Sequence, residues 1–140
     1  RRAGCYVRVV EGDSRVRASL VGMLSAVQIL TDAYASVDAL QKDIESIERT
    51  PDGVICDYRL PDGRTAHDVV QLILQQFDSV PFLTVSAERL DAADFRCLDI
   101  VAVCAKPINA EDLIKALAEL LARGAAKRSL LGGIQPGKAG

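Results

Sequence analysis

The chain has 140 residues, of which 49% are apolar and 26% are charged, and its formal net charge is −2. This length fits one domain with a tail, and the composition excludes a disordered, collagen-like or coiled-coil chain. Residues 3–123 carry 12 basic and 19 acidic side chains. That acidic balance argues against a domain that binds nucleic acid through its phosphates.

The sequence shows neither a membrane span nor a secretory signal. No apolar run approaches the roughly 18 residues that a membrane span requires, and only a short apolar run follows Arg1 and Arg2. We therefore expect a cytoplasmic domain without membrane contact. The four cysteines form no Cys-x-x-Cys pair and lie in apolar stretches, which favours reduced, buried thiols: Cys5, Cys56, Cys97 and Cys104.

Strand-like and helix-like patterns alternate along the chain. The first half predicts strands over 6–10, 27–31 and 53–56, with helices over 16–24 and 37–47. The second half predicts helices over 65–77, 88–97 and 109–123, with strands over 81–85 and 100–104. Ser36 and Asn109 are expected to cap helix N-termini, and the periodicity of the helix over 88–97 is weak.

These elements predict one domain over residues 5–123. Five strands that alternate with five helices specify an α/β fold, a doubly wound parallel sheet of five strands. We interpret residues 1–4 as an N-terminal extension. Residues 124–140 are rich in glycine and are interpreted as a flexible tail or linker.

Polar residues follow four of the predicted strands, where ligands bind in folds of this kind. They are Glu11 and Asp13, then Asp57, Ser86 and Lys106. The three acids together suit Mg²⁺, which takes oxygen ligands. Lys106 would neutralise a phosphoryl group, Ser86 would donate a hydrogen bond, and Asp57 could be the nucleophile of an aspartyl phosphate. Any one of them alone would be an ordinary cap or loop residue, but four at successive strand ends favour a site.

The sequence around these positions resembles the receiver domains of two-component response regulators over about residues 5–123. Four stretches carry the resemblance: Val9-Val10-Glu11-Gly12-Asp13, residues 51–61 from Pro51 through Asp57 to Pro61, residues 80–87 with Ser86-Ala87, and Ala105-Lys106-Pro107-Ile108. The resemblance implies a flavodoxin-like sheet with strand order 2-1-3-4-5. It also implies a domain that stands alone or belongs to a hybrid histidine kinase or longer regulator.

The resemblance implies a role for each site residue. Asp57 would accept a phosphoryl group from a phosphohistidine on a histidine kinase or phosphotransfer protein, Ser86 would be the switch hydroxyl, and Lys106 would bind the phosphate. Mg²⁺ would be held by Glu11, Asp57 and the backbone carbonyl of Arg59, with Asp13 as a further candidate. A second copy of the chain is another candidate partner, in a weak homodimer.

Two positions depart from the family pattern. Gly12 stands where the family places a second acid, so Mg²⁺ is expected to bind weakly, and Asp13 is also well placed to cap the first helix. Val103 stands where the family usually has a switching aromatic ring. These departures keep open a pseudo-receiver, a protein-interaction module of the same fold that does not turn over phosphate.

Three further residues are considered. His67, the only histidine, is expected to be a surface residue. Arg59 and Glu88 lie two residues after Asp57 and Ser86, and they either form an exposed ion pair over the acceptor or remain separately solvated. A flavodoxin-like binding protein or hydrolase is disfavoured, because neither Gly-x-Gly-x-x-Gly nor Gly-x-Ser-x-Gly occurs.

Overall fold

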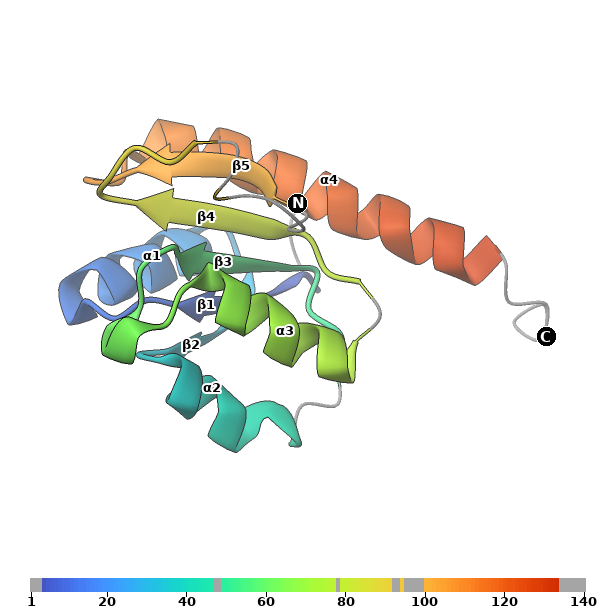
Figure 1. Ribbon diagram of the computed structural model, residues 1–140. Coiled ribbons are helices and arrows are strands. Elements are labelled where there is room, and N and C mark those ends of the chain that lie inside the picture. The colour runs from blue at the N-terminus through green and yellow to red at the C-terminus, as the bar shows by residue number, and fades with distance from the viewer. Residues whose placement is uncertain (1–3, 47–48, 78, 92–93, 95–99, 134–140) are drawn as a thin grey trace.

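The computed structural model describes residues 4–46, 49–77, 79–91, 94 and 100–133 (Figure 1). Its five strands form one parallel sheet in the order β2-β1-β3-β4-β5, which confirms the predicted fold class and strand order. The strands are β1 (Tyr6–Val10), β2 (Leu30–Tyr34), β3 (Gly53–Asp57), β4 (Phe82–Ser86) and β5 (Ile100–Ala105). The helices are α1 (Ser14–Ala26), α2 (Val37–Ile44), α3 (Ala66–Gln76) and α4 (Ala110–Gly133), with a 3-10 turn, η1, at Pro61–Gly63.

Helices cover both faces of the sheet (Figure 1). Along β1, Val7 and Val9 pack against α1 and α4, whereas Val10 packs against α2 and α3. The central strands β1, β3 and β4 are buried along their whole length. Apolar strands covered on both sides are typical of parallel sheets, and they leave the strand ends as the place for polar groups.

The second strand lies further along the chain than its apolar run predicts. The strand expected over 27–31 starts three residues later than predicted, because residues 27–29 close the C-terminus of α1. The amides of Val27 and Ile29 both donate to the carbonyl of Leu24, and Gln28 adopts a left-handed φ of 63°. The strand therefore begins at Leu30, after the orphan carbonyls of the helix have been satisfied.

The last helix continues beyond the predicted domain boundary. Asn109 Oδ1 accepts hydrogen bonds from the amides of Glu111 and Asp112, as expected for an N-cap, but α4 runs on to Gly133. The flexible tail expected from residue 124 is therefore helical as far as residue 133. Figure 1 shows this helix extending past the edge of the sheet. No helix in the described ranges is both long and apolar enough to cross a membrane.

The helix expected over 88–97 is not seen in the part of it that the structure describes. Residues 88–91 are irregular, and residues 92–93 and 95–97 lie outside the described residues. The described chain thus has four α-helices where five were predicted. Cys56 and Cys104 are buried free thiols and Cys5 is half-buried, while Cys97 lies outside the described residues.

Candidate functional site

Three of the predicted site residues meet at the carboxyl ends of the strands. Asp57 ends β3, Glu11 directly follows β1, and Lys106 directly follows β5. The Nζ atom of Lys106 lies 2.9 Å from Oδ2 of Asp57. The same Nζ lies 3.0 Å from Oε1 and 3.2 Å from Oε2 of Glu11. The ammonium group therefore joins two carboxylates that come from different strands.

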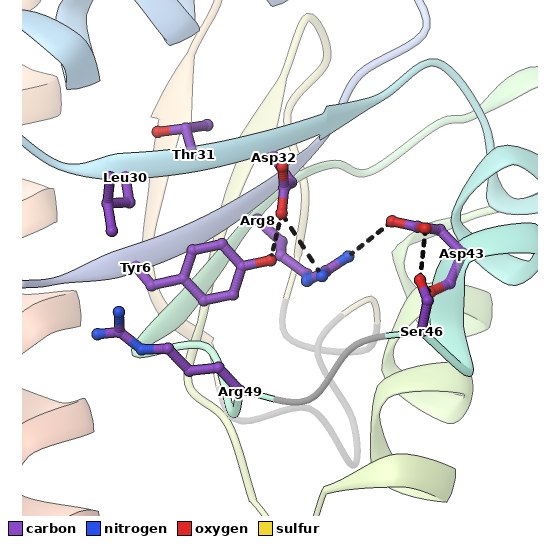
Figure 2. A pocket seen from close by; sticks show the side chains of 8 residues that line it. All are labelled: Tyr6, Arg8, Leu30, Thr31, Asp32, Asp43, Ser46 and Arg49. Carbon is purple, nitrogen blue, oxygen red and sulfur yellow. Dashed lines mark hydrogen bonds and ion pairs between the residues drawn. The ribbon is translucent and has the colours of Figure 1, made fainter.

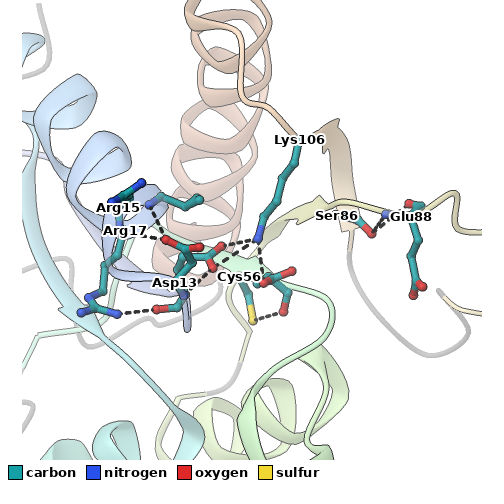
Figure 3. Close-up of polar contacts among 10 residues, drawn as sticks. Asp13, Arg15, Arg17, Cys56, Ser86, Glu88 and Lys106 are labelled. Carbon is teal, nitrogen blue, oxygen red and sulfur yellow. Dashed lines mark hydrogen bonds and ion pairs between the residues drawn. The ribbon is translucent and has the colours of Figure 1, made fainter.

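Backbone hydrogen bonds hold these residues in position. The amide of Lys106 donates to the carbonyl of Ser86 at 2.9 Å, which fixes the start of the loop after β5. The amide of Glu11 donates to the carbonyl of Tyr34 at 3.0 Å. Arg17 Nη1, from the first turns of α1, donates to the carbonyl of Glu11 at 2.8 Å (Figure 3). Arg17 was not expected at the site, because a basic residue on an amphipathic helix carries no local sign of such a contact.

Glu11 is the most deeply buried charged residue of the site, with 1% of its surface exposed. Burial raises the pKa of its carboxyl above the ordinary value, and the hydrogen bonds from the Asp13 amide and from Lys106 oppose that rise. A buried carboxylate is tolerated only when it is paired. Lys106 supplies that pairing.

Lys106 remains a cation at this position. Burial by itself would lower the pKa of its ammonium group, but the hydrogen bonds to Asp57 and Glu11 outweigh burial and raise the pKa above the ordinary value. The site therefore holds a fixed positive charge beside the Asp57 carboxylate. A fixed cation beside a carboxylate can neutralise the charge of an anionic group that is transferred to that carboxylate.

Asp13 caps the first helix. Its Oδ1 atom accepts hydrogen bonds from the amides of Arg15 at 2.8 Å and Val16 at 3.2 Å (Figure 3). These two bonds lower the pKa of its carboxyl. The capping role considered from the sequence is thus confirmed.

The donors at this site do not make a complete set for a divalent cation. Three of the four carboxylate oxygens of Glu11 and Asp57 already contact the Lys106 ammonium. Gly12 supplies no carboxylate, and Asp13 is engaged at the helix N-terminus. Within the described ranges, no group of three His, Cys, Asp or Glu side chains is arranged to hold a metal ion. Mg²⁺ coordination by Glu11, Asp57 and the Arg59 carbonyl stays a prediction from the sequence.

Ser86 is buried at the end of β4, as predicted, but its hydroxyl turns to its own loop. The Oγ atom donates to the carbonyl of Glu88 at 2.9 Å and accepts from the Glu88 amide at 3.1 Å. In Figure 3 the Ser86 hydroxyl lies beside Glu88 and apart from the Lys106 cluster. To turn toward Asp57, the Ser86 hydroxyl would have to give up its two hydrogen bonds to Glu88 and form new ones.

Two opposite charges form an ion pair between the loops that follow β3 and β4. Arg59 Nε donates to Oε1 of Glu88 at 2.7 Å. The Arg59 guanidinium also lies over the Tyr58 ring, at 5.2 Å from its centre. Of the two alternatives for Arg59 and Glu88, the structure has the ion pair.

His67 is partly exposed, in line with the expected surface residue, but its side chain contacts Asp94 and Tyr58. Its Nε2 atom lies 2.9 Å from the backbone carbonyl of Asp94, and its ring packs edge-on against Tyr58. It is half-buried at the start of α3. The contact joins α3 to residue 94, which no local pattern indicates. Val103, in contrast, is an exposed apolar residue on β5.

A second polar cluster surrounds Arg8 within β1, and it was not expected from the sequence. Arg8 is 3% exposed and stacks between the rings of Tyr6 and Tyr34, with its Cζ atom 5.3 Å from each ring centre. The Tyr6 hydroxyl donates to Asp32 at 2.6 Å. Tyr6, Arg8 and Asp32 line a pocket of about 520 Å³, and Figure 2 shows their side chains. The available signal was a single arginine inside an otherwise apolar strand.

Comparison with solved structures places the fold among receiver domains. The chemotaxis protein CheY4 of Vibrio cholerae aligns with a TM-score of 0.74 at 20% identity, over 85% of this chain and 100% of that one. The signal receiver domain of an HD domain-containing protein from Pseudomonas fluorescens Pf-5 gives 0.75 at 19%, over 89% and 92%. The receiver domain of the hybrid histidine kinase CckA gives 0.68 at 18%, over 83% and 98%.

The comparisons by sequence found nothing. No protein-family model matches this chain, and no curated protein matches it. At these low identities the structural likeness defines the fold. The chain therefore has the fold of response-regulator receiver domains, as its sequence motifs predicted.

Proposed function

We propose that the chain is a phosphoacceptor receiver domain of a two-component phosphorelay, which takes a phosphoryl group from a phosphohistidine onto Asp57. The observation that carries this proposal is the contact of 2.9 Å between the Asp57 carboxylate and the Lys106 ammonium at the carboxyl end of a central strand. The receiver fold supports the same assignment. The donor would be a histidine kinase or a histidine phosphotransfer domain in the cytoplasm.

The proposed step transfers one phosphoryl group between two nucleophiles. A carboxylate oxygen of Asp57 forms a bond to phosphorus while the P–N bond to the donor imidazole breaks, and the imidazole nitrogen keeps the electron pair and takes up a proton. Lys106 neutralises the phosphoryl oxygens as they enter, because its charge is already fixed beside Asp57. Ser86 can turn from Glu88 to donate to a phosphoryl oxygen.

Loss of phosphate would be a second in-line displacement, in which water is the nucleophile, the Asp57 carboxylate is the leaving group and inorganic phosphate is released. The acyl phosphate on Asp57 is hydrolysed when water attacks phosphorus in line with the bond to the carboxylate oxygen. The chain thus catalyses at most its own phosphorylation and dephosphorylation. It is a signalling domain rather than an enzyme that turns over a separate substrate.

The test is an intact-mass measurement after incubation with a small phosphoryl donor such as acetyl phosphate, in buffer that contains Mg²⁺. We expect one phosphoryl adduct on the wild-type chain and none on Asp57→Asn, which keeps the shape of the side chain but removes the nucleophilic charge. Labelling of Asp57→Asn at the wild-type rate would refute Asp57 as the acceptor. Circular dichroism of the variant provides the control for folding.

The second candidate function is a pseudo-receiver, a docking module that never carries phosphate. Gly12 favours it, because the second acid of the family pattern is missing, and Val103 favours it, because no aromatic ring can report the state of the acceptor. A folded wild-type chain that gains no adduct from acetyl phosphate or phosphoramidate would select this alternative. One adduct on Asp57 would exclude it.

A further inference from the structure

We propose that the Lys106 ammonium takes the place of the divalent cation in the acceptor pocket, so that Asp57 accepts phosphate without Mg²⁺. This inference rests on the proposed function of Asp57. It concerns the source of the positive charge at the site and follows from three features: the contacts of Lys106, the crowding at Gly12 and the engagement of Asp13.

The first feature is the position of the ammonium. Its Nζ atom lies between Glu11 and Asp57, at 3.0 and 3.2 Å from the two oxygens of Glu11 and at 2.9 Å from Oδ2 of Asp57. A dication that used the same oxygens would have to displace the ammonium or accept its repulsion at short range. Two carboxylates and one ammonium carry a net charge of only −1, so the attraction for a dication is also small.

The second feature is the space around Gly12. A Cβ atom added at this position would lie 3.1 Å from both Cδ and Cγ of Pro61. The proline ring therefore packs directly against the place where a side chain at residue 12 would begin. A side chain at position 12 therefore requires the proline ring to shift by a few tenths of an ångström.

The third feature is that carboxylate oxygens near the site already accept hydrogen bonds. Glu11 Oε2 accepts the Asp13 amide at 3.0 Å in addition to Lys106, and Asp13 Oδ1 serves the N-terminus of α1. Mg²⁺ demands near-octahedral oxygen ligands at about 2.0–2.1 Å and gives up water reluctantly. Coordination by Glu11 Oε2 or by Asp57 Oδ2 would therefore compete with the Lys106 ammonium, and coordination by Asp13 Oδ1 would break the helix cap.

Glu11 then acts as a positioning residue. Because Glu11 is buried and its Oε1 and Oε2 atoms lie 3.0 and 3.2 Å from Nζ, it holds the ammonium of Lys106 beside Asp57. On transfer, Lys106 exchanges its contact with the Asp57 carboxylate for contacts with phosphoryl oxygens. No other cation is needed for this exchange of partners.

The first measurement compares phosphorylation with and without a metal ion. Wild-type chain is incubated with phosphoramidate in Mg²⁺ or in EDTA, and the adduct is followed by intact mass. We expect equal rates within about twofold, and a loss of labelling in Lys106→Met but not in Lys115→Met, which removes an exposed lysine on α4. Labelling that requires Mg²⁺ overturns this inference but leaves Asp57 as the acceptor.

The second measurement does not depend on phosphorylation. Mn²⁺ is titrated into the wild-type chain and the broadening of the amide signals of Gly12, Asp57 and Lys106 is followed by NMR. We expect no saturable broadening in the wild type and its appearance in Lys106→Met, in which two carboxylates lose their counter-charge. Saturable broadening in the wild type overturns the inference, even if no adduct ever forms.

A third variant guards against misfolding of Lys106→Met. Gly12→Asp adds a carboxylate while Lys106 is retained, and we expect saturable Mn²⁺ broadening to appear in this variant as a third acid joins the site. A wild-type affinity equal to that of Gly12→Asp would mean that the pocket already binds the metal, which contradicts the inference. Absence of labelling in both Mg²⁺ and EDTA would instead refute the proposed function.

Discussion

Arg59 and Glu88 are joined by a hydrogen-bonded ion pair, with Nε of Arg59 2.7 Å from Oε1 of Glu88. Each residue lies two positions beyond a site residue, Asp57 and Ser86 respectively. The pair therefore links the loop that follows Asp57 at the end of β3 with the loop that follows Ser86 at the end of β4. Both side chains are exposed, so the pair contributes little to stability.

We expect this ion pair to lengthen the life of the phosphoryl group. Arg59→Ala and Glu88→Ala should each speed the loss of phosphate, because either change opens the volume that an in-line water needs. An exposed pair is worth about 0.2–1 kcal/mol, which corresponds to at most roughly a fivefold change in rate. The measurement is the decay of the intact-mass adduct after the donor is removed.

The double variant Arg59→Ala/Glu88→Ala distinguishes a shared lid from two separate effects. Since either change breaks the same pair, the double variant should lose phosphate little faster than each single variant. Arg64→Ala is the matched control, because Arg64 pairs with Asp38 at 3.5 Å instead. Single variants that decay at the wild-type rate, or effects that simply multiply, would exclude the lid.

The buried Arg8 makes a prediction about stability. The Tyr34 hydroxyl accepts a hydrogen bond from Arg8 Nη1, while Asp32 and Asp43 lie 3.6 and 3.9 Å from the guanidinium. Tyr34→Phe should therefore lower the free energy of unfolding by about 1–3 kcal/mol, because it leaves a buried donor poorly paired. Urea denaturation provides the measurement.

Replacement of Arg8 itself should lower the free energy of unfolding by a smaller amount than Tyr34→Phe does. Asp32 and Asp43 are 55% and 48% exposed, so neither becomes a buried unpaired charge when the arginine is replaced. The double variant Arg8→Met/Tyr34→Phe should be more stable than Tyr34→Phe alone. A double variant that is less stable would show that the arginine stabilises the fold through its stacking on Tyr6.

The hydrogen bond between Tyr34 and Asp43 leads to a prediction about how the stability of the fold depends on pH. The Tyr34 hydroxyl donates to Asp43, and this bond, helped by Ser46, lowers the pKa of the Asp43 carboxyl. A carboxyl whose pKa is lower in the folded state stabilises the fold above its unfolded pKa, and that stability is lost as the pH falls through the folded pKa. NMR titration should therefore show a higher pKa of Asp43 in Tyr34→Phe. An unchanged pKa would assign the shift to Ser46.

The packing of α4 makes a prediction at Gly124. A Cβ atom at this position would lie 2.2 Å from the backbone carbonyl oxygen of Asp52, which cannot move without shifting the start of β3. Gly124→Ala should destabilise the fold by about 1–3 kcal/mol. Thermal or urea denaturation measures the change.

Gly22→Ala is the control for this effect. Gly22 lies within α1, and a Cβ atom there meets nothing within 4 Å. The same substitution should therefore stabilise the fold, by about 0.4–1 kcal/mol. Equal stability changes at Gly22 and Gly124 would contradict the close approach of α4 to Asp52.

Much of the sheet and of the site could be predicted from the sequence. Apolar runs and helical periodicity are local properties, and they were sufficient to predict five parallel strands and the strand ends where Glu11, Asp57 and Lys106 lie, whereas the strand order came from the resemblance to receiver domains. They were not sufficient for boundaries that depend on hydrogen bonds between neighbouring turns. The shift of β2 to Leu30 is of this kind.

The contacts between the site residues could be seen only in the folded structure. Lys106 and Glu11 are 95 residues apart, and their contact exists because β1 and β5 each end at the same edge of the sheet. Likewise, the contacts of His67 with Asp94 and of Arg59 with Glu88 join segments whose sequences show no pattern that links them. Pairing between side chains so far apart in the sequence depends on tertiary packing. The intervening chain is flexible before folding, so it does not set the distance between the partners until the sheet has formed.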